Sequence, residues 1–268
     1  MPKIQRRRLK SFQAIGRAAV PAIFTSELVS KVATRLRVDP TLILLASNLA
    51  VFSLWKAPSM QDFLMDHFTR QSRDIGQKHK LYQFLTSGFS HDELDHLFNN
   101  MFTLALLGPR VCRMMGIRRF SYFYVGSLYA ADLFCENVYW PKYKRARGFL
   151  SRLMDLWPSF ALGASGGICS IEAYYCLKFA REYRKLQARY NFWDIVRWFF
   201  KVAELLDEVS EPISADVGHG AHVGGIFFGV GFFVASELGK AAFTMWQKWK
   251  TKRSQLRKTS LATRHSHH

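Results

Sequence analysis

Acidic residues and cysteines are both scarce in this sequence of 268 residues. Acidic residues number 20 against 38 lysines and arginines, which gives a formal net charge of +18. That excess leaves nucleic acid, anionic lipid or an organellar targeting segment as explanations. The four cysteines show no Cys-x-x-Cys spacing, which argues against a disulfide or zinc framework and predicts reduced, buried thiols: Cys112, Cys135, Cys169 and Cys176.

Long uninterrupted hydrophobic runs are also few. The mean hydropathy is only -0.06 although 49% of the residues are hydrophobic, so apolar runs must alternate with charged connections. A membrane-spanning helix needs about 17–25 apolar residues, and several of the runs are marginal by that measure. We expect an all-α, polytopic membrane protein, with a soluble protein of buried helices as the alternative. The six candidate runs are residues 41–55, 94–111, 120–139, 157–180, 192–206 and 217–238.

The charge distribution divides the chain into three parts. Residues 1–37 are rich in arginine, poor in acid and amphipathic, which predicts a mitochondrial targeting segment; a nucleic-acid arm and a membrane-surface anchor are the alternatives. Residues 38–239 form the predicted transmembrane domain, with Asp39-Pro40 as a helix start. Residues 240–268 form a basic tail, expected at solvent or lipid headgroups. Because the positive charge lies at the ends and in connections, no nucleic-acid partner is expected.

The sequence Gly163-Ala164-Ser165-Gly166-Gly167 opens the apolar helical run that begins at Ile168. Glycines leave room for a substrate backbone, and a helix N-terminus offers unpaired N–H groups to a developing oxyanion. A serine in this position is well placed to act as a nucleophile. Close contact between membrane helices is the alternative explanation for such small residues.

Two further polar groups lie within apolar runs. His96 and Asn100 are four residues apart on one predicted helix face, with His91 about a turn earlier. They suit either an internal hydrogen-bonded pair or donors to an oxyanion. No carboxylate or third ligand shares that face, so no metal is expected.

The last apolar run carries small residues at every fourth position, namely Ala221, Gly225 and Gly229. Such a seam lets two membrane helices approach closely. His222 is next to it and comes within reach of Ser165 if the seam packs against the serine-bearing helix. A base of this kind would activate the hydroxyl. His219, which precedes the seam, is the weaker candidate.

Three motifs, each on its own apolar run, occur in the order typical of one family. The chain resembles the rhomboid family of intramembrane serine proteases from about residue 81 to residue 238, and it is most similar to the mitochondrial presenilin-associated branch. The motifs are H-x4-H-x3-N at His91, His96 and Asn100, G-x-S-G at residues 163–166, and A-H-x-x-G at residues 221–225.

The resemblance implies a six-helix transmembrane bundle and a role for each motif residue. Ser165 would be the nucleophile and His222 the general base. The oxyanion would be bound by His96, Asn100 and the Ser165 backbone N–H, with support from His91. Gly163 and Gly166 would make room for the substrate strand. No cofactor is implied.

Some positions depart from the family pattern. Residues 80–83 lack its Trp-Arg pair, Cys169 stands where many members have a tyrosine, and residues 204–216 form an unusually acidic connection. We predict a protease of the mitochondrial inner membrane that cleaves transmembrane proteins. The alternative is a catalytically silent subunit that binds transmembrane helices within an inner-membrane translocase or respiratory complex. The lipid bilayer and membrane-protein substrates are the expected partners.

Overall fold

Helices make up most of the described structure. The computed structural model describes residues 26–36, 38–71, 80–139, 160–183, 192–210 and 218–265. The helices are α2 (Ser26–Leu36), α3 (Pro40–Trp55), α4 (Gln61–His67), α6 (Gln83–Thr86), α7 (Leu94–Met115), α8 (Ile117–Phe134), α11 (Ser165–Tyr183), α12 (Phe192–Ser210) and α13 (His219–His265). Shorter elements are the 3-10 turns η1 (Pro58–Met60) and η2 (Ser87–Phe89), the π-helical turn η3 (Cys135–Tyr139), and the strands β1 (Arg70–Gln71) and β2 (Phe160–Ala161). The all-α prediction is confirmed.

Each of the six apolar runs contributes a helix, with two differences from expectation. The fourth run becomes helical only at Ser165, since β2 and a loop occupy residues 160–164. Residues 204–210 belong to α12, so the interpretation of residues 204–216 as a connection was wrong for that part. Of the predicted targeting segment, residues 1–37, the structure describes only residues 26–36, which form α2.

Only part of this helical structure meets the length and hydropathy expected of a membrane span. Among the described residues, the stretch His219–Arg253 of α13 does so alone. Helix α3 passes the same test together with Pro58–His67, as a pair bent by 102°. Helix α3 starts where the sequence indicates, because Asp39 caps it by accepting a 2.8 Å hydrogen bond from the Thr41 N–H.

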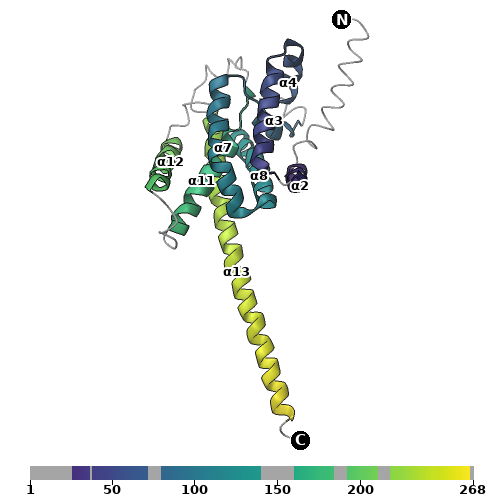
Figure 1. The fold of residues 1–268 in the computed structure, drawn as a ribbon, viewed down its shortest axis with the longest axis vertical. Coiled ribbons are helices and arrows are strands. Elements are labelled where there is room, and N and C mark those ends of the chain that lie inside the picture. The colour runs from purple at the N-terminus through teal and green to yellow at the C-terminus, as the bar shows by residue number, and fades with distance from the viewer. Residues whose placement is uncertain are drawn as a thin grey trace, which may run out of the picture. The chain divides into compact units, whose positions relative to one another are not determined.

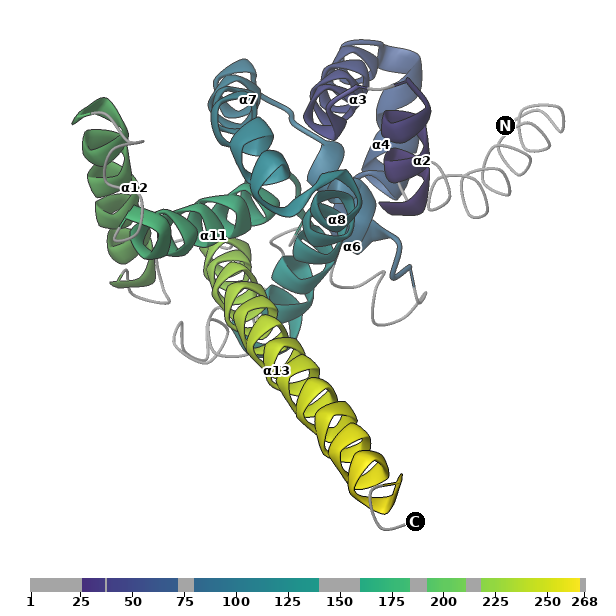
Figure 2. The ribbon, with the colours of Figure 1, turned by 60° about the horizontal axis from the view of Figure 1, so that its bottom comes forward.

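The core lies between α7, α8 and α11, which contact one another (Figures 1 and 2). Helix α3 packs on α7, and α2 packs on α8. The three core helices bury large side chains such as Leu104, Tyr124 and Ile171. This arrangement brings the start of α7 close to the start of α11, where the predicted site residues lie.

Contacts divide the chain into two compact units, Met1–Val230 and Gly231–His268. The first contains all the predicted site residues. The described part of the second belongs to α13, which is 47 residues long in all, so the predicted tail begins inside a helix. The described side chains of this second unit are mostly exposed.

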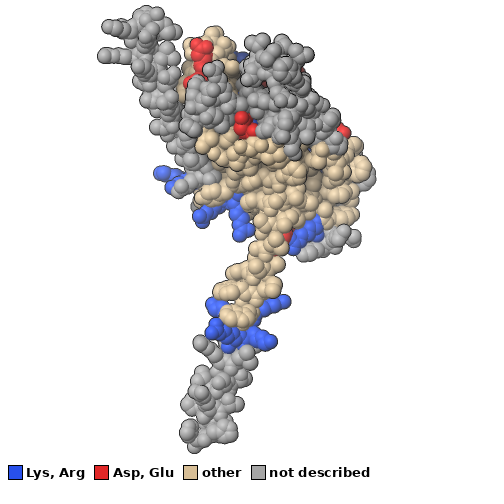
Figure 3. Space-filling view, turned by 180° about the vertical axis from the view of Figure 1, so that it is seen from behind, with Lys and Arg blue, Asp and Glu red and all other residues tan. Residues whose placement is uncertain are grey.

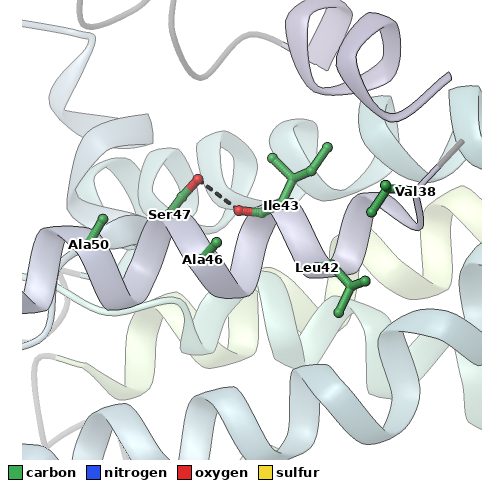
Figure 4. A pocket seen from close by; sticks show the side chains of 6 residues that line it. All are labelled: Val38, Leu42, Ile43, Ala46, Ser47 and Ala50. Atoms are coloured by element: carbon green, nitrogen blue, oxygen red, sulfur yellow. Dashed lines mark hydrogen bonds between the residues drawn. The ribbon is translucent and has the colours of Figure 1, made fainter. Parts of the chain in front are cut away.

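An open groove of about 410 Å³ lies along α3 (Figure 4). Its one hydroxyl, that of Ser47, donates a 2.8 Å hydrogen bond to the Ile43 carbonyl. None of the predicted site residues lines the groove. It is lined by Val38, Leu42, Ile43, Ala46, Ser47 and Ala50.

Candidate active site

Ser165 is the first residue of α11, and the loop before it is held by backbone contacts. Residues of β2 pair antiparallel with β1, in the register Arg70 with Ala161. The Gly163 N–H then donates a 2.9 Å hydrogen bond to the carbonyl of Ser87. Gly163 has φ +125°, a conformation that disfavours residues with a Cβ. The glycine therefore allows the turn that brings Ser165 to the helix start.

The N-terminal part of α13 lies directly against α11 through the predicted seam. A Cβ at Gly225 would collide with the carbonyl oxygen of Gly166, and one at Gly229 would lie 2.5 Å from the Ser170 carbonyl oxygen. The Ser170 hydroxyl donates a 2.7 Å hydrogen bond to the Gly225 carbonyl. The predicted close contact between these helices is confirmed.

This contact brings His222 to Ser165. The histidine Nε2 lies 2.7 Å from the serine Oγ, which is hydrogen-bond distance. Both residues are half-buried. A neutral imidazole in this position accepts the hydroxyl proton and can later return it.

His96, near the start of α7, lies beside the loop that precedes Ser165. A Cβ on Gly163 would lie 2.8 Å from His96 Nε2, so the imidazole occupies the space that the glycine leaves. Its Nδ1 faces Asp92, 3.9 Å from the carboxylate Oδ1. The histidine is therefore placed beside the peptide that precedes the nucleophile.

His91 contacts the same loop through Ala164. It is fully buried, and its Nε2 accepts a 3.4 Å hydrogen bond from the Ala164 N–H. Its ring lies 4.9 Å from the His96 ring in an edge-on contact. Burial, with the neighbouring His96 as a second cause, lowers the pKa of His91 to about 3, so the ring is neutral near pH 7 and available as an acceptor.

Asn100 is buried one turn after His96, but its amide has a different partner from the one the resemblance implies. Its Nδ2 donates a 2.9 Å hydrogen bond to the His96 carbonyl within α7. The side chain thus shares the face of His96, as expected, while one of its two N–H donors is used by its own helix. Gly166 faces Ala131 and Ala221, and a Cβ there would lie 2.7 Å from the Ala131 Cβ.

Comparison with known proteins agrees with these motifs. The family model of the rhomboid domain matches residues 78–236. The chain belongs to the rhomboid family. The predicted rhomboid-like helical membrane bundle is accordingly confirmed.

Several mitochondrial rhomboids are similar to this rhomboid. Rhomboid protein 1 of Saccharomyces cerevisiae is 34% identical over 128 residues, which cover 48% of this chain and 33% of that protein. Presenilin-associated rhomboid-like protein A of Danio rerio is 26% identical over 215 residues, covering 76% and 48%. The human presenilin-associated protein is 26% identical over 194 residues, covering 70% and 45%. The matched region therefore spans a third to a half of the length of these relatives.

Two ion pairs in the interior of this rhomboid were not predicted from the sequence. Arg70 of β1 pairs with Asp132 of α8, and Glu172 of α11 pairs with Lys201 of α12. Asp132 and Glu172 are acidic residues inside apolar runs, which is itself a signal of a buried partner or a functional group. Their partners lie far away in the sequence, so the signal names only half of each pair. Among the described residues, no three His, Cys, Asp or Glu side chains gather in a way that could hold a metal ion.

Proposed function

We propose that this rhomboid is an intramembrane serine protease that hydrolyses peptide bonds in or near transmembrane segments of other proteins. The observation that carries the proposal is the 2.7 Å contact between His222 Nε2 and Ser165 Oγ at the start of α11. Ser165 and His222 are 57 residues apart in sequence, and their helices meet through the glycine seam. A serine hydroxyl with a histidine base at hydrogen-bond distance is suited to nucleophilic catalysis.

The reaction proceeds in two halves. His222 removes the hydroxyl proton while Ser165 Oγ attacks the scissile carbonyl, and the protonated imidazole then gives that proton to the leaving amine. Water, deprotonated by His222, next attacks the acyl ester and releases the new carboxyl terminus and the free serine. We assign the backbone N–H groups at the start of α11 and the imidazole of His96, which lies beside Gly163, as donors to the developing oxyanion.

Asn100 would join the oxyanion site through the second N–H of its Nδ2, because the bond to the His96 carbonyl uses only one of the two. Gly163 and Gly166 make room for neighbours within the fold, because His96 lies where a Cβ of Gly163 would be and Ala131 lies where a Cβ of Gly166 would be. The substrate must unwind locally, because a helix hides its carbonyl groups from attack.

The membrane setting follows from the family and from α13. We propose that it is a multi-pass protein of the mitochondrial inner membrane; the names of its relatives support the mitochondrial part of this proposal. Residues 1–37 remain a predicted targeting segment, and membership of a larger inner-membrane complex is part of the same proposal. Water must reach Ser165 from one membrane surface for hydrolysis to occur.

The second unit of α13 has the composition of a segment at the lipid headgroups. Phe243, Trp246 and Trp249 are at least half exposed, and no acidic residue follows Glu237 in the sequence. Lys250 lies 5.2 Å from the Trp246 ring and Arg253 lies 5.1 Å from the Trp249 ring. Figure 3 shows lysines and arginines gathered around this stretch of α13. Aromatic and basic side chains together favour anionic headgroups.

The decisive experiment compares wild type with Ser165→Ala and His222→Asn, each purified in lipid. A single-span reporter tests cleavage, and a fluorophosphonate tests the reactivity of the serine. We expect cleavage and labelling in wild type and a loss of about 10⁶-fold in the rate of cleavage in either variant. Unchanged thermal unfolding of the variants serves as the control for folding.

The opposite result would support the catalytically silent subunit. If folded wild type neither cleaves several reporters nor reacts with the fluorophosphonate, the protease proposal fails. The retained fold would then serve to bind transmembrane helices, and co-purification of such proteins with the Ser165→Ala variant and wild type alike would identify the partners.

A further inference from the structure

Arg70 is a buried cation close to the serine loop but outside the motifs of the family. Its side chain is 2% exposed, and its Nη1 lies 3.3 Å from the Asp132 carbonyl oxygen and 3.5 Å from the Asp132 carboxylate Oδ1. A guanidinium that is removed from water in this way requires such partners, because an unpaired buried charge is strongly unfavourable.

Two connections lead from this ion pair to the loop that precedes Ser165. The first is the backbone of Arg70, which pairs with Ala161 in the two-stranded sheet. The second passes through Ser87. Its hydroxyl shares its proton between the Gln83 carbonyl at 2.6 Å and Asp132 Oδ2 at 2.9 Å, and its carbonyl accepts the 2.9 Å hydrogen bond from the Gly163 N–H.

The two connections meet on one short loop, residues 160–164. This loop ends at Ser165, and its Gly163 has a positive φ. The ion pair is therefore attached to the loop by a strand on one side and by a hydrogen-bond chain on the other. Neither connection touches the Ser165 hydroxyl, so any effect on it must be through position.

We propose that Arg70 and Asp132 are positioning residues that hold the loop 160–164 and keep Ser165 Oγ within reach of His222. The effect on catalysis rests on the proposed protease function; the effect on the loop itself does not. Loss of the pair should leave substrate binding nearly intact while lowering the fraction of molecules in which serine, base and oxyanion donors are aligned. The expected sign is a fall in kcat with little change in KM.

The test uses Asp132→Asn, Arg70→Gln and Ser87→Ala in the full chain in lipid. Asp132→Asn keeps an acceptor for Ser87 but removes the charge that Arg70 needs. Ser87→Ala leaves the ion pair intact and removes only its link to the loop. A displacement of about 1 Å at a catalytic group can cost about 10²-fold, so we expect losses in kcat of up to about 10²-fold for the ion-pair variants and a smaller loss for Ser87→Ala. Arg70→Lys, which retains the charge, should recover part of the rate.

Glu172→Gln and Lys201→Gln provide the matched control. They break a buried ion pair of the same fold that has no hydrogen-bond connection to the loop among the described residues. We expect them to lower the unfolding temperature at least as much as Asp132→Asn does, with kcat within about 3-fold of wild type, because the loop geometry does not depend on them.

Hydrogen–deuterium exchange of the segment 160–168 gives a second readout that does not depend on proteolysis. Faster exchange in Asp132→Asn and Arg70→Gln, but not in the control variants, supports the positioning role even if wild type has no protease activity. If wild type is active but the ion-pair variants lose kcat only in proportion to stability, as the controls do, with unchanged loop exchange, the proposal is wrong. An inactive wild type with unchanged loop exchange overturns it as well.

Discussion

Helix α11 is held by two opposite kinds of contact. Helix α13 approaches it through Gly225 and Gly229, where a Cβ would meet the backbone carbonyl oxygens of α11. Between Glu172 and Phe179, α12 is attached to α11 by long side chains. Lys201 Nζ lies 2.6 Å from Glu172 and 2.7 Å from Glu204, and the Trp198 indole donates a 3.0 Å hydrogen bond to the Cys176 carbonyl. The Trp198 ring also stacks on Phe179, with centroids 6.1 Å apart.

The two kinds of contact differ in how far they can adjust. A contact made by the absence of side chains has no atoms that can move aside, so it defines the distance between Ser165 and His222 closely. A contact made by lysine, glutamate and tryptophan can adjust through rotamers when the helices shift. We infer that α11 and α13 behave as a rigid pair around the dyad, whereas α12 tolerates change. Three experiments test this contrast.

Substitution of Gly225 should have the largest effect. In Gly225→Val the new side chain meets the Gly166 carbonyl, so the helices must separate and the dyad is lost. We expect cleavage at background and a loss in the free energy of unfolding of about 3 kcal/mol, near the upper end for overpacking. Thermal unfolding and fluorophosphonate labelling measure the two effects.

Gly231→Ala is the control on the same helix. A Cβ at this position meets nothing within 4 Å, and alanine favours a helix over glycine by about 1 kcal/mol. Stability should therefore hold or rise slightly, with full activity. Equal damage from both substitutions would show that the seam has no special role.

Breaking the Glu172–Lys201 ion pair between α11 and α12 should reduce stability without disabling the dyad. Lys201→Met leaves the buried Glu172 with one cation fewer, and loss of one partner of a buried pair costs about 3 kcal/mol. The double variant Glu172→Gln with Lys201→Met should recover most of that loss. Labelling of Ser165 should stay close to wild type throughout. A loss of labelling with intact fold would mean that α12 is as strictly coupled to the site as α13.

Acid should destabilise the fold through His91. Near neutral pH this is the smallest of the expected effects. The pKa of His91 falls from 6.5 to about 3 on folding, so the unfolded chain binds the extra proton. The stabilisation by neutral His91 is complete above pH 6.5 and is lost as the pH falls from 6.5 towards 3, by about 1.4 kcal/mol per pH unit. His91→Gln should flatten the slope in thermal unfolding between pH 6.5 and 4.5. An unchanged slope would assign the acid sensitivity to other groups.

The helices and the reactive motifs were predictable from sequence because their signals are local. Asp39-Pro40 marks the start of α3, and each apolar run contributes a helix. The three small residues of the last run indicate a close helix contact before any partner is known. Boundaries that depend on neighbours were less accessible: residues 160–161 pair with β1 instead of extending α11, and α12 continues through the acidic residues to Ser210.

The side-chain pairings of the site required the fold. Asn100 has two possible partners for its amide, and the choice of the His96 carbonyl depends on rotamers that no spacing reveals. Arg70 and Asp132 are 62 residues apart and belong to different kinds of element. The carboxylates Asp132 and Glu172 within apolar runs indicate buried charge. The cation that pairs with each is decided by how the helices pack.

The sequence by itself determined the helical class, the family and the candidate site residues, because helix formation and motif spacing act over a few residues. The tertiary structure decided that His222 reaches Ser165, that Asn100 bonds within its own helix, and that a distant arginine and aspartate brace the serine loop. These outcomes depend on distances between segments far apart in the chain, and close packing sets those distances to within the fraction of an ångström that hydrogen bonds demand.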